Sequence, residues 1–252
     1  MRVDWSPLAA ELSLWRRDGL SLPIWWRDDD AVADTPALAR LAKLSSGLGV
    51  PVHVAVIPDL IEASLPVAMA QMPMLIPVVH GWRHISHAPA DAKNAEFGQM
   101  RETATAELAQ GLARLTQRFG AALLPVFVPP WNRIDAVFMP ILATAGYQGV
   151  STYGPRAAPF AAAGLHRINT HIDPILWRGD RGLVSPDILL AGLVSTLRDR
   201  RGGRTDATEP LGLLTHHLAH TEAVWGFTGD VLRMLLEGGA VPADLRAFLL
   251  SA

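Results

Sequence analysis

Short apolar runs alternate with amphipathic helical stretches along most of this chain, and no other feature of the sequence constrains the fold as strongly. Runs rich in Val, Ile, Leu and aromatic residues predict strands over residues 22–27, 50–57, 75–79, 123–128, 149–152, 166–169 and 211–215. Apolar residues at helical spacing predict helices over residues 36–48, 95–119 and 186–200, the last with Ser185 as its N-cap. Strands that alternate with helices over 252 residues predict an α/β fold. At this length we expect a barrel of about seven parallel strands, in one domain of residues 1–252.

Five of the predicted strands end abruptly in polar residues that are capable of chemistry. These endings are Asp28-Asp29-Asp30, His80 with His84, the turn Pro129-Pro130-Trp131-Asn132, His171 with Asp173, and His216-His217. The carboxyl ends of parallel strands converge on one face of such a fold, where sites are built. We therefore expect these side chains to surround a single site.

The chain has nine His and eight Trp but no Cys. Without thiolates, a metal ion could be held only by carboxylate oxygen and imidazole nitrogen. His80 and His84 with one carboxylate, and with water in an open position, form the ligand set of a catalytic divalent metal. Zinc suits this set best, although Co, Ni, Mn or Fe(II) could occupy it. We expect one divalent metal ion per chain.

The residues alone leave several assignments open. Any of the three adjacent Asp could reach the site, or one of them could cap the helix that follows. His87 could replace His84 as a ligand. Either His216 or His217 could protonate a departing amine, and Asp173 could orient that histidine through its second ring nitrogen.

Several tryptophans lie within a few residues of these polar motifs. Although most tryptophans serve the core, an indole face can also stack on the apolar face of a sugar ring. In the Pro-Pro-Trp-Asn turn, a rigid loop would present such a face beside a hydrogen-bonding amide. The candidate substrate-binding residues are Trp82, Pro130, Trp131, Asn132 and Trp177.

The order of these motifs resembles the polysaccharide deacetylase superfamily, the metal-dependent chitooligosaccharide and peptidoglycan deacetylases. The resemblance covers the chain from about Ile24 to His217. Five motifs match in the family's order, namely Asp29-Asp30, His80-Gly-Trp-Arg-His84, Pro130-Trp131, Asp173 to Trp177, and Leu214-Thr215-His216. The resemblance implies an irregular (β/α) barrel that carries out metal-assisted amide hydrolysis.

By the same resemblance, Asp29 is the general base and Asp30, His80 and His84 hold the metal. His216 protonates the departing amine.

The sequence departs from the family pattern at two positions. Val128 stands where the family has an arginine that pairs with the base, and Arg27 or Arg133 could substitute for it. Ala31 stands where a glycine usually follows the Asp pair. The arrangement Arg-x-Asp-Asp, which begins at Arg27, is common among divergent relatives and favours Asp29-Asp30 over Asp28-Asp29 as the functional pair.

The resemblance implies a divalent-metal hydrolase that removes an N-acyl group, acetyl in the first place, from an amino sugar or oligosaccharide. The alternatives are hydrolysis of another C–N or ester bond in a non-sugar metabolite, and a barrel that binds carbohydrate without catalysis. A net charge of −2 with both signs scattered offers no basic surface for nucleic acid or a membrane. Asp4 and Glu11 interrupt the N-terminal segment, which does not read as a signal peptide, so we expect a cytoplasmic protein.

Overall fold

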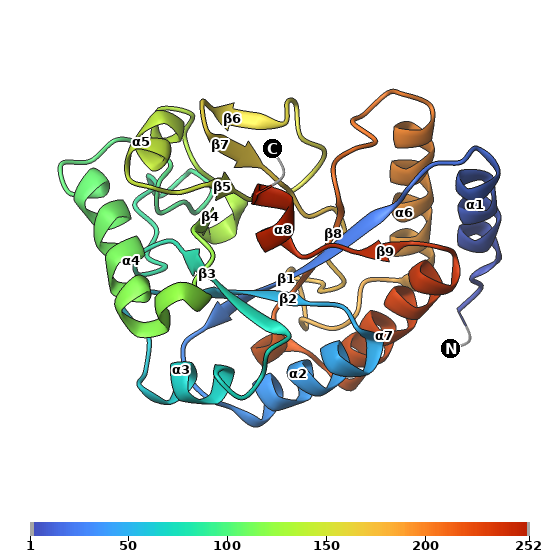
Figure 1. The fold of residues 1–252 in the computed structure, drawn as a ribbon, viewed down its shortest axis with the longest axis horizontal. Helices are drawn as coiled ribbons and strands as arrows, with labels where there is room; N and C mark the ends of the chain where they lie inside the picture. The colour runs from blue at the N-terminus through green and yellow to red at the C-terminus, as the bar shows by residue number, and fades with distance from the viewer. Residues whose placement is uncertain (1–2, 251–252) are drawn as a thin grey trace.

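A curved sheet of nine strands lies at the centre of the computed structural model, which describes residues 3–250 (Figure 1). The strands are β1 (Pro23–Ala31), β2 (Val52–Val56), β3 (Leu75–His80), β4 (Val126–Val128), β5 (Gly149–Val150), β6 (Phe160–Ala162), β7 (Leu165–Arg167), β8 (Leu211–Thr215) and β9 (Val241–Pro242). Strands β7-β5-β4-β3-β2-β1-β8 run parallel in that order, β6 is antiparallel to β7, and β9 pairs with the start of β1. The predicted α/β fold with a mostly parallel, barrel-like sheet is confirmed.

The sheet curls into a barrel that is closed irregularly. Within residues 3–250, the segment that leaves β7 meets β8 through a single bridge between Ile172 and Leu213. The N–H of Leu214 donates to the Ile172 carbonyl at 2.8 Å across this seam. Gly212 permits the close approach, because a Cβ there would lie 2.6 Å from the carbonyl oxygen of Asn169. The seam is therefore built from an irregular segment and not from a ladder of strand hydrogen bonds.

Alternate residues of each strand point to opposite sides of the sheet. One set, which includes Trp26 and Phe127, packs against the helices on the outer face. The other set, which includes Trp25 and Val126, fills the inside of the barrel. The helix α8 (Leu245–Leu250) packs against this inner set through Leu245, in the hollow of the curved sheet (Figure 1). The direction of each strand residue therefore decides whether it faces a helix or the inside of the barrel.

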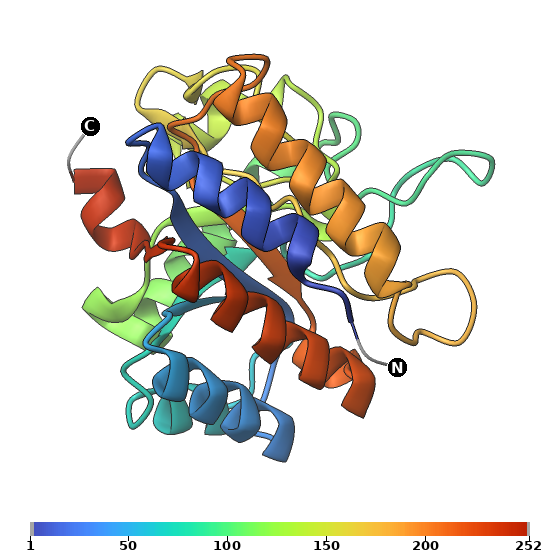
Figure 2. The same ribbon diagram turned by 90° about the vertical axis from the view of Figure 1, so that its right-hand side faces the viewer.

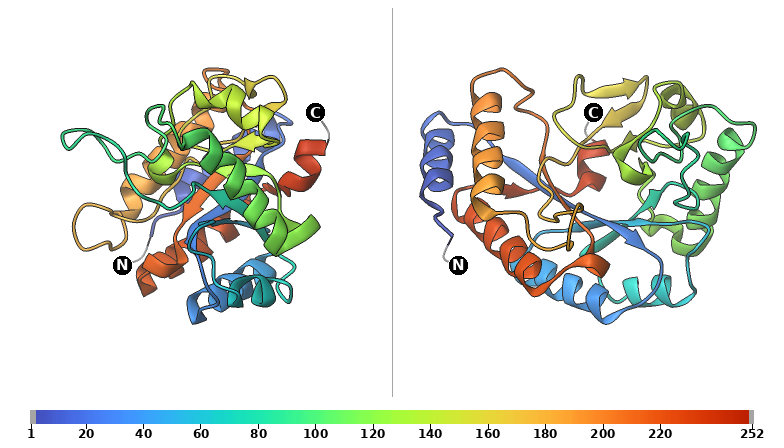
Figure 3. Two further views of the ribbon diagram at one scale, coloured as in Figure 1. Left: turned by 90° about the vertical axis from the view of Figure 1, so that its left-hand side faces the viewer. Right: turned by 180° about the vertical axis from the view of Figure 1, so that it is seen from behind.

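The remaining helices cover the outer face of the sheet. They are α1 (Ser6–Arg17), α2 (Pro36–Leu48), α3 (Ser64–Met69), α4 (Ala104–Phe119), α5 (Phe138–Thr144), α6 (Pro186–Arg201) and α7 (Glu222–Glu237). Figure 2 shows α1, α6 and α7 side by side along one flank. Two long loops, one after β3 and one before α6, project from the same end of the barrel (Figure 3).

Two predicted boundaries need correction. The strand predicted over residues 22–27 continues as β1 to Ala31, so Asp28, Asp29 and Asp30 lie within the strand and not beyond its end. The helix predicted over residues 95–119 begins only at Ala104, because Glu96 and Phe97 are buried in a loop that bridges to Ile134. Ser185 stands at the N-cap position of α6 but makes no capping hydrogen bond with its side chain. The sequence patterns do not predict seven further elements, namely α1, α3, α5, α7, α8, β6 and β9. No helix within residues 3–250 has the length and apolar character needed to cross a membrane.

Candidate active site

The geometry of β1 separates the three adjacent aspartates. Trp25, Arg27 and Asp29 alternate with Trp26 and Asp28, so the two sets point to opposite sides of the sheet. The pairing of β1 with β2 contains a bulge between Asp28 and Ala31.

Within that bulge, Asp30 has a positive φ of 74°. A bulge re-aims the side chain that it contains, and Asp29 and Asp30 consequently both line one cavity while Asp28 does not. Thr35 caps α2, since its hydroxyl accepts the N–H of Leu38 at 3.1 Å, so none of the three aspartates is needed as a cap.

Asp28 forms a buried ion pair with His217 on the outer side of the sheet. Its carboxylate lies 2.5 Å from His217 Nδ1 and accepts the Thr215 hydroxyl at 2.6 Å and the N–H of His217 at 3.0 Å. Burial opposes both charges, but their mutual attraction lowers the pKa of Asp28 and raises that of His217. The pair fixes the end of β8 and leaves His216 as the histidine that faces the cavity.

The cavity has a volume of about 790 Å³ at the carboxyl ends of the strands. The residues that line it are Asp29, Asp30, His80, His84, Trp131, Asn132, Arg133, Tyr153, Asp173, Ile175, Trp177, Arg181, Leu214 and His216. The structure thus brings together Asp29, Asp30, His80, His84, Trp131, Asn132, Asp173, Trp177 and His216, all of which are site candidates from the sequence. Tyr153 and Arg181 line the same cavity but carry no sequence signal that would have identified them.

Backbone strain concentrates at this cavity. Within residues 3–250, the non-glycine residues with positive φ are Asp30, His84, Trp131, Asn132 and Arg181, and every one of them lines the cavity. Such conformations cost of order 1–3 kcal/mol each and gather at sites where function demands them. The local chain is therefore held in shape by the surrounding structure and not by its own conformational preference.

Asp30, His80 and His84 form a group that could hold a metal ion, with one donor atom from each lying within 4.8 Å of the others. His80 Nδ1 lies 3.0 Å from the Val128 carbonyl, which can only accept, so Nδ1 donates its proton there and Nε2 is an acceptor whenever the ring is neutral. Nε2 then faces Asp30 Oδ1 at 3.0 Å, and His84 Nε2 lies 3.3 Å from the same oxygen. Acceptors that face each other this closely need a proton or a cation between them. The donor set therefore fits a divalent cation.

The close approach of these side chains also shifts the pKa values of the two histidines. Burial disfavours a charged His80, but the hydrogen bond to Asp30 and the charges of Asp29 and Asp30 outweigh it and raise the pKa of His80. Burial and the neighbouring His80 lower the pKa of His84, which favours the neutral imidazole that a metal requires. His87 is exposed on the loop beyond and does not belong to the group.

A buried glutamate that was missed in the sequence supports the loop carrying His84. The carboxylate of Glu96 accepts the N–H groups of Trp82 at 3.0 Å and Arg83 at 2.7 Å. Gly81 makes this possible, because it has a φ of +56° and a Cβ there would lie 2.6 Å from the ring of Pro130. Glu96 escaped prediction because it falls inside a stretch whose apolar spacing resembles a helix.

Arg27 pairs with Asp29 inside the barrel. Its Nε and Nη2 donate to the two carboxylate oxygens, each at 2.9 Å, and both side chains are buried. The same guanidinium donates to the Ser151 hydroxyl at 2.7 Å and to Asn132 Oδ1 at 2.6 Å. Arg133 was the other candidate to replace the family's arginine, but it donates to the Asn94 carbonyl and not to Asp29.

The predicted aromatic residues divide between the cavity and the core. Trp131 lies against His84 with a ring separation of 4.4 Å, and Trp177 meets His216 edge-on at 4.5 Å. Trp82 lies outside the cavity, where it is 8 % exposed, because its ring packs beneath the guanidinium groups of two arginines. Pro130 is buried against Gly81, so neither Trp82 nor Pro130 lines the cavity as predicted.

Asp173 was expected to hydrogen-bond a histidine, but its partners are Trp177 and the backbone of Ile175. Its carboxylate accepts Trp177 Nε1 at 2.7 Å and the N–H of Ile175 at 3.0 Å. Burial raises its pKa, while the nearby His216 acts in the opposite direction. No hydrogen bond within the described chain joins Asp173 to His216, whose buried Nδ1 has no partner. Asp173 thus orients Trp177, which packs against His216, and acts on His216 itself through its charge and not through a hydrogen bond.

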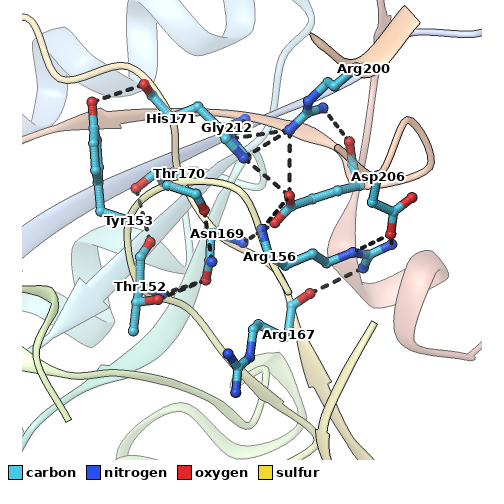
Figure 4. Close-up of polar contacts among 12 residues, drawn as sticks. Thr152, Tyr153, Arg156, Arg167, Asn169, Thr170, His171, Arg200, Asp206 and Gly212 are labelled. Atoms are coloured by element: carbon cyan, nitrogen blue, oxygen red, sulfur yellow. Dashed lines mark hydrogen bonds and ion pairs between the residues drawn. The ribbon is translucent and has the colours of Figure 1, made fainter. Parts of the chain in front are cut away.

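A buried polar network supports the cavity wall behind β7 and β8 (Figure 4). The Glu209 carboxylate accepts the N–H of Asn169 at 3.0 Å and lies 3.2 Å from His171 Nε2 and 3.6 Å from Arg200 Nη2. The hydroxyl of Tyr153 donates to the His171 carbonyl at 2.9 Å. Burial raises the pKa of Tyr153 to about 12, so it stays a donor at neutral pH. His171 belongs to this network and not to the cavity.

Comparison with known proteins gives matches at the level of structure. No protein-family model and no curated protein sequence matches the chain. A family 4 acetyl xylan esterase from Clostridium thermocellum, solved with a cobalt ion, is similar with 13 % identity and a TM-score of 0.54, over 90 % of both chains. A peptidoglycan N-acetylglucosamine deacetylase is similar with 14 % identity and a TM-score of 0.57, over 90 % of this chain and 87 % of that one.

A third similar structure, from Bacillus anthracis, is described as a pseudoenzyme of the same family 4. It matches with 14 % identity and a TM-score of 0.55, over 91 % of this chain and 66 % of that one. The same barrel therefore occurs in active and inactive proteins, and only the site can separate the two. The chain has the fold of the family 4 carbohydrate esterases, to which polysaccharide and peptidoglycan deacetylases of known structure belong.

Proposed function

We propose that this protein is a divalent-metal-dependent hydrolase that removes an N-acyl group, acetyl in the first place, from an amino sugar or oligosaccharide. One observation carries the proposal. The β1 bulge delivers two neighbouring carboxylates to one cavity in different surroundings, with Asp30 among two imidazoles and Asp29 against Arg27. Two carboxylates in contrasting environments suit two different roles, one as ligand and one as base.

Asp30, His80 and His84 would hold the metal ion, and zinc suits these ligands best. A divalent ion bound there supplies Lewis-acid chemistry, since it acidifies water and polarises the acyl oxygen. His80 is prepared for this role by its Nδ1 hydrogen bond to Val128, which leaves Nε2 free to coordinate.

Asp29 takes the proton of the attacking water. The two hydrogen bonds from Arg27 fix the plane of its carboxylate, so its orientation does not depend on the substrate. Arg27 is in turn held by Ser151 and Asn132, from the ends of β5 and β4. In this arrangement Arg27 does what the family's arginine would do from the position of Val128.

His216 gives a proton to the departing amine. It lines the cavity from the end of β8, and the indole of Trp177 restricts its ring. Trp131 and Trp177 offer aromatic surface to a sugar ring, and Asn132 and Tyr153 offer polar groups beside it. A pocket with aromatic walls and a few placed polar groups is typical of small-ligand sites.

The test is acetate release from N-acetylglucosamine and its short oligomers by protein loaded with zinc, cobalt or nickel. We expect acetate in proportion to bound metal and none after chelation. Acetylated esters and simple acetamides, assayed in parallel, separate an esterase or a non-sugar amidase from a sugar deacetylase. Sugar binding without acetate from any substrate would favour the non-catalytic barrel.

A further inference from the structure

A side pocket of about 370 Å³ adjoins the cavity and shares Asn132 and Arg133 with it. Thr152, from the end of β5, and Arg167, from the end of β7, also line this pocket, and no Asp or Glu does. We infer that the side pocket binds an anionic group, a carboxylate or a phosphate, carried by the amino-sugar substrate. This inference rests on the proposed function, because it assigns the charge of that substrate.

The arginines around the pocket differ from most others in the chain. Within residues 3–250, the arginines outside any ion pair are Arg16, Arg118, Arg133, Arg167, Arg178 and Arg181. Arg133 and Arg167 line the side pocket, and Arg181 lines the adjoining cavity. Three of these six unpaired arginines therefore gather at the two adjoining openings, and in the side pocket, which has no acidic residue in its lining, the charge of Arg133 and Arg167 can act on a ligand.

Arg167 carries the strongest evidence for a missing partner. Its Nε is shielded from solvent and has no hydrogen-bond partner. Its backbone carbonyl accepts Arg156 Nη1 at 3.1 Å, while its own guanidinium points away from that network (Figure 4). A buried donor without an acceptor is costly and rare in folded proteins. An acidic oxygen in the side pocket would satisfy it.

The remaining polar groups of the pocket also favour an acceptor. Asn132 Oδ1 is occupied by Arg27 at 2.6 Å, which leaves its amide NH₂ as the free end. Arg133 uses only one donor internally, toward the Asn94 carbonyl. The planar guanidinium groups of Arg133 and Arg167 match carboxylate and phosphate oxygens in two-point hydrogen bonds. The pocket therefore presents an excess of donors.

The inference is tested by calorimetric binding to metal-free protein, which does not depend on catalysis. The probes are neutral N-acetylglucosamine, its 1-phosphate and 6-phosphate, and N-acetylmuramic acid. We expect at least one anionic probe to bind about tenfold to one hundredfold more tightly than the neutral sugar, the range expected for a hydrogen bond to a charged group. The preferred probe distinguishes a phosphate from a carboxylate.

The matched variants are Arg133→Gln and Arg167→Gln, with Arg118→Gln as control, since Arg118 is exposed on α4 and also lacks an ion pair. The anionic preference should disappear in the first two variants and persist in the third. Equal binding of all probes, or a preference that survives both pocket substitutions, overturns the inference. Anionic preference without acetate release would support the side pocket as an anion site and would contradict the proposed hydrolase activity.

Discussion

The guanidinium of Arg27 and the carboxylate of Asp29 form a two-point ion pair inside the barrel, with both contacts at 2.9 Å. Because the residues are two apart on one strand, they face the same side without any help from a loop. The pair is anchored at its far end by Ser151 and Asn132. The orientation of the proposed base therefore depends on β1 itself.

Arg27→Lys should reduce acetate release about 100-fold while leaving the metal in place, because lysine keeps the charge but cannot make the two-point contact. Arg27→Met should also lower the free energy of unfolding by about 3 kcal/mol, since it leaves Asp29 buried and uncompensated. Steady-state kinetics, metal analysis and urea unfolding measure the three quantities. The control Arg118→Lys should release acetate at the wild-type rate. If Arg27→Lys also released acetate at that rate, Arg27 would have no role in orienting the base.

Substitution of the three adjacent aspartates should give three different phenotypes. Asp30→Ala should reduce bound metal from one per chain to near zero, because Asp30 is the carboxylate of the three-donor group. Asp29→Asn should keep the metal and reduce acetate release about 1000-fold, the scale of general-base catalysis. Asp28→Asn should keep the metal but destabilise the fold by about 3 kcal/mol, since His217 loses its buried partner. Metal loss in Asp28→Asn would contradict the assignment.

The sequence predicted the fold because alternation of strands and helices is a local pattern, and it predicted most of the cavity lining because strand ends converge. Strand alternation alone could not separate Asp28 from Asp30, since their different directions depend on a bulge in the pairing with β2, and the choice of Asp29-Asp30 rested on the family resemblance. It also misplaced Trp82, because a residue beside His80 and His84 in sequence can still point into the packing of α4. Neighbours in sequence are not neighbours in space when a turn intervenes.

The supporting residues were the hardest to predict. Glu96 acts through two backbone N–H groups, and no motif records a contact of that kind. Arg167 stands in an ordinary strand pattern, and only the surrounding structure shows that its Nε lacks a partner. Such roles follow from the packing of distant segments, and composition or spacing does not encode them.

His216 and His217 should respond in opposite ways to substitution by asparagine. His216→Asn should reduce acetate release by 100-fold or more, on the order expected for a lost general acid, with stability nearly unchanged. His217→Asn should lower the free energy of unfolding by about 3 kcal/mol, because it leaves Asp28 buried without its counter-charge. Kinetics and chemical denaturation separate the two effects. The reverse pattern would make His217 the acid.

Glu96→Gln should weaken metal binding about tenfold to one hundredfold, a typical loss when the support of a metal ligand is removed. The N–H groups of Trp82 and Arg83 are accepted by different oxygens of Glu96, so in glutamine one of them would face an NH₂ donor, which would loosen the loop that carries His84. Competition with a chelator measures the affinity. Glu102→Gln, at an exposed position six residues along, is the control and should bind metal like the wild type. Unaltered affinity in Glu96→Gln would show that the loop holds its shape without this carboxylate.

Acid should destabilise the protein through His53, which joins β1, β2 and α8. Its Nδ1 donates to the Trp26 carbonyl at 3.1 Å and its Nε2 accepts the N–H of Leu245 at 3.2 Å, so only the neutral ring satisfies both contacts. Burial lowers its pKa from 6.5 to about 4, and the unfolded chain therefore binds the extra proton first as the pH falls.

The stabilising effect of a neutral His53 is consequently complete above pH 6.5 and is lost as the pH falls toward about 4. The difference corresponds to about 3 kcal/mol across that range. Urea unfolding of His53→Gln should show a pH dependence weaker than that of the wild type by this amount, and His87→Gln, at an exposed loop position, should not. Hydrogen exchange should show the amide of Leu245 losing protection in the wild type over the same range. An unchanged pH dependence in His53→Gln would mean that α8 stays docked on a charged imidazole.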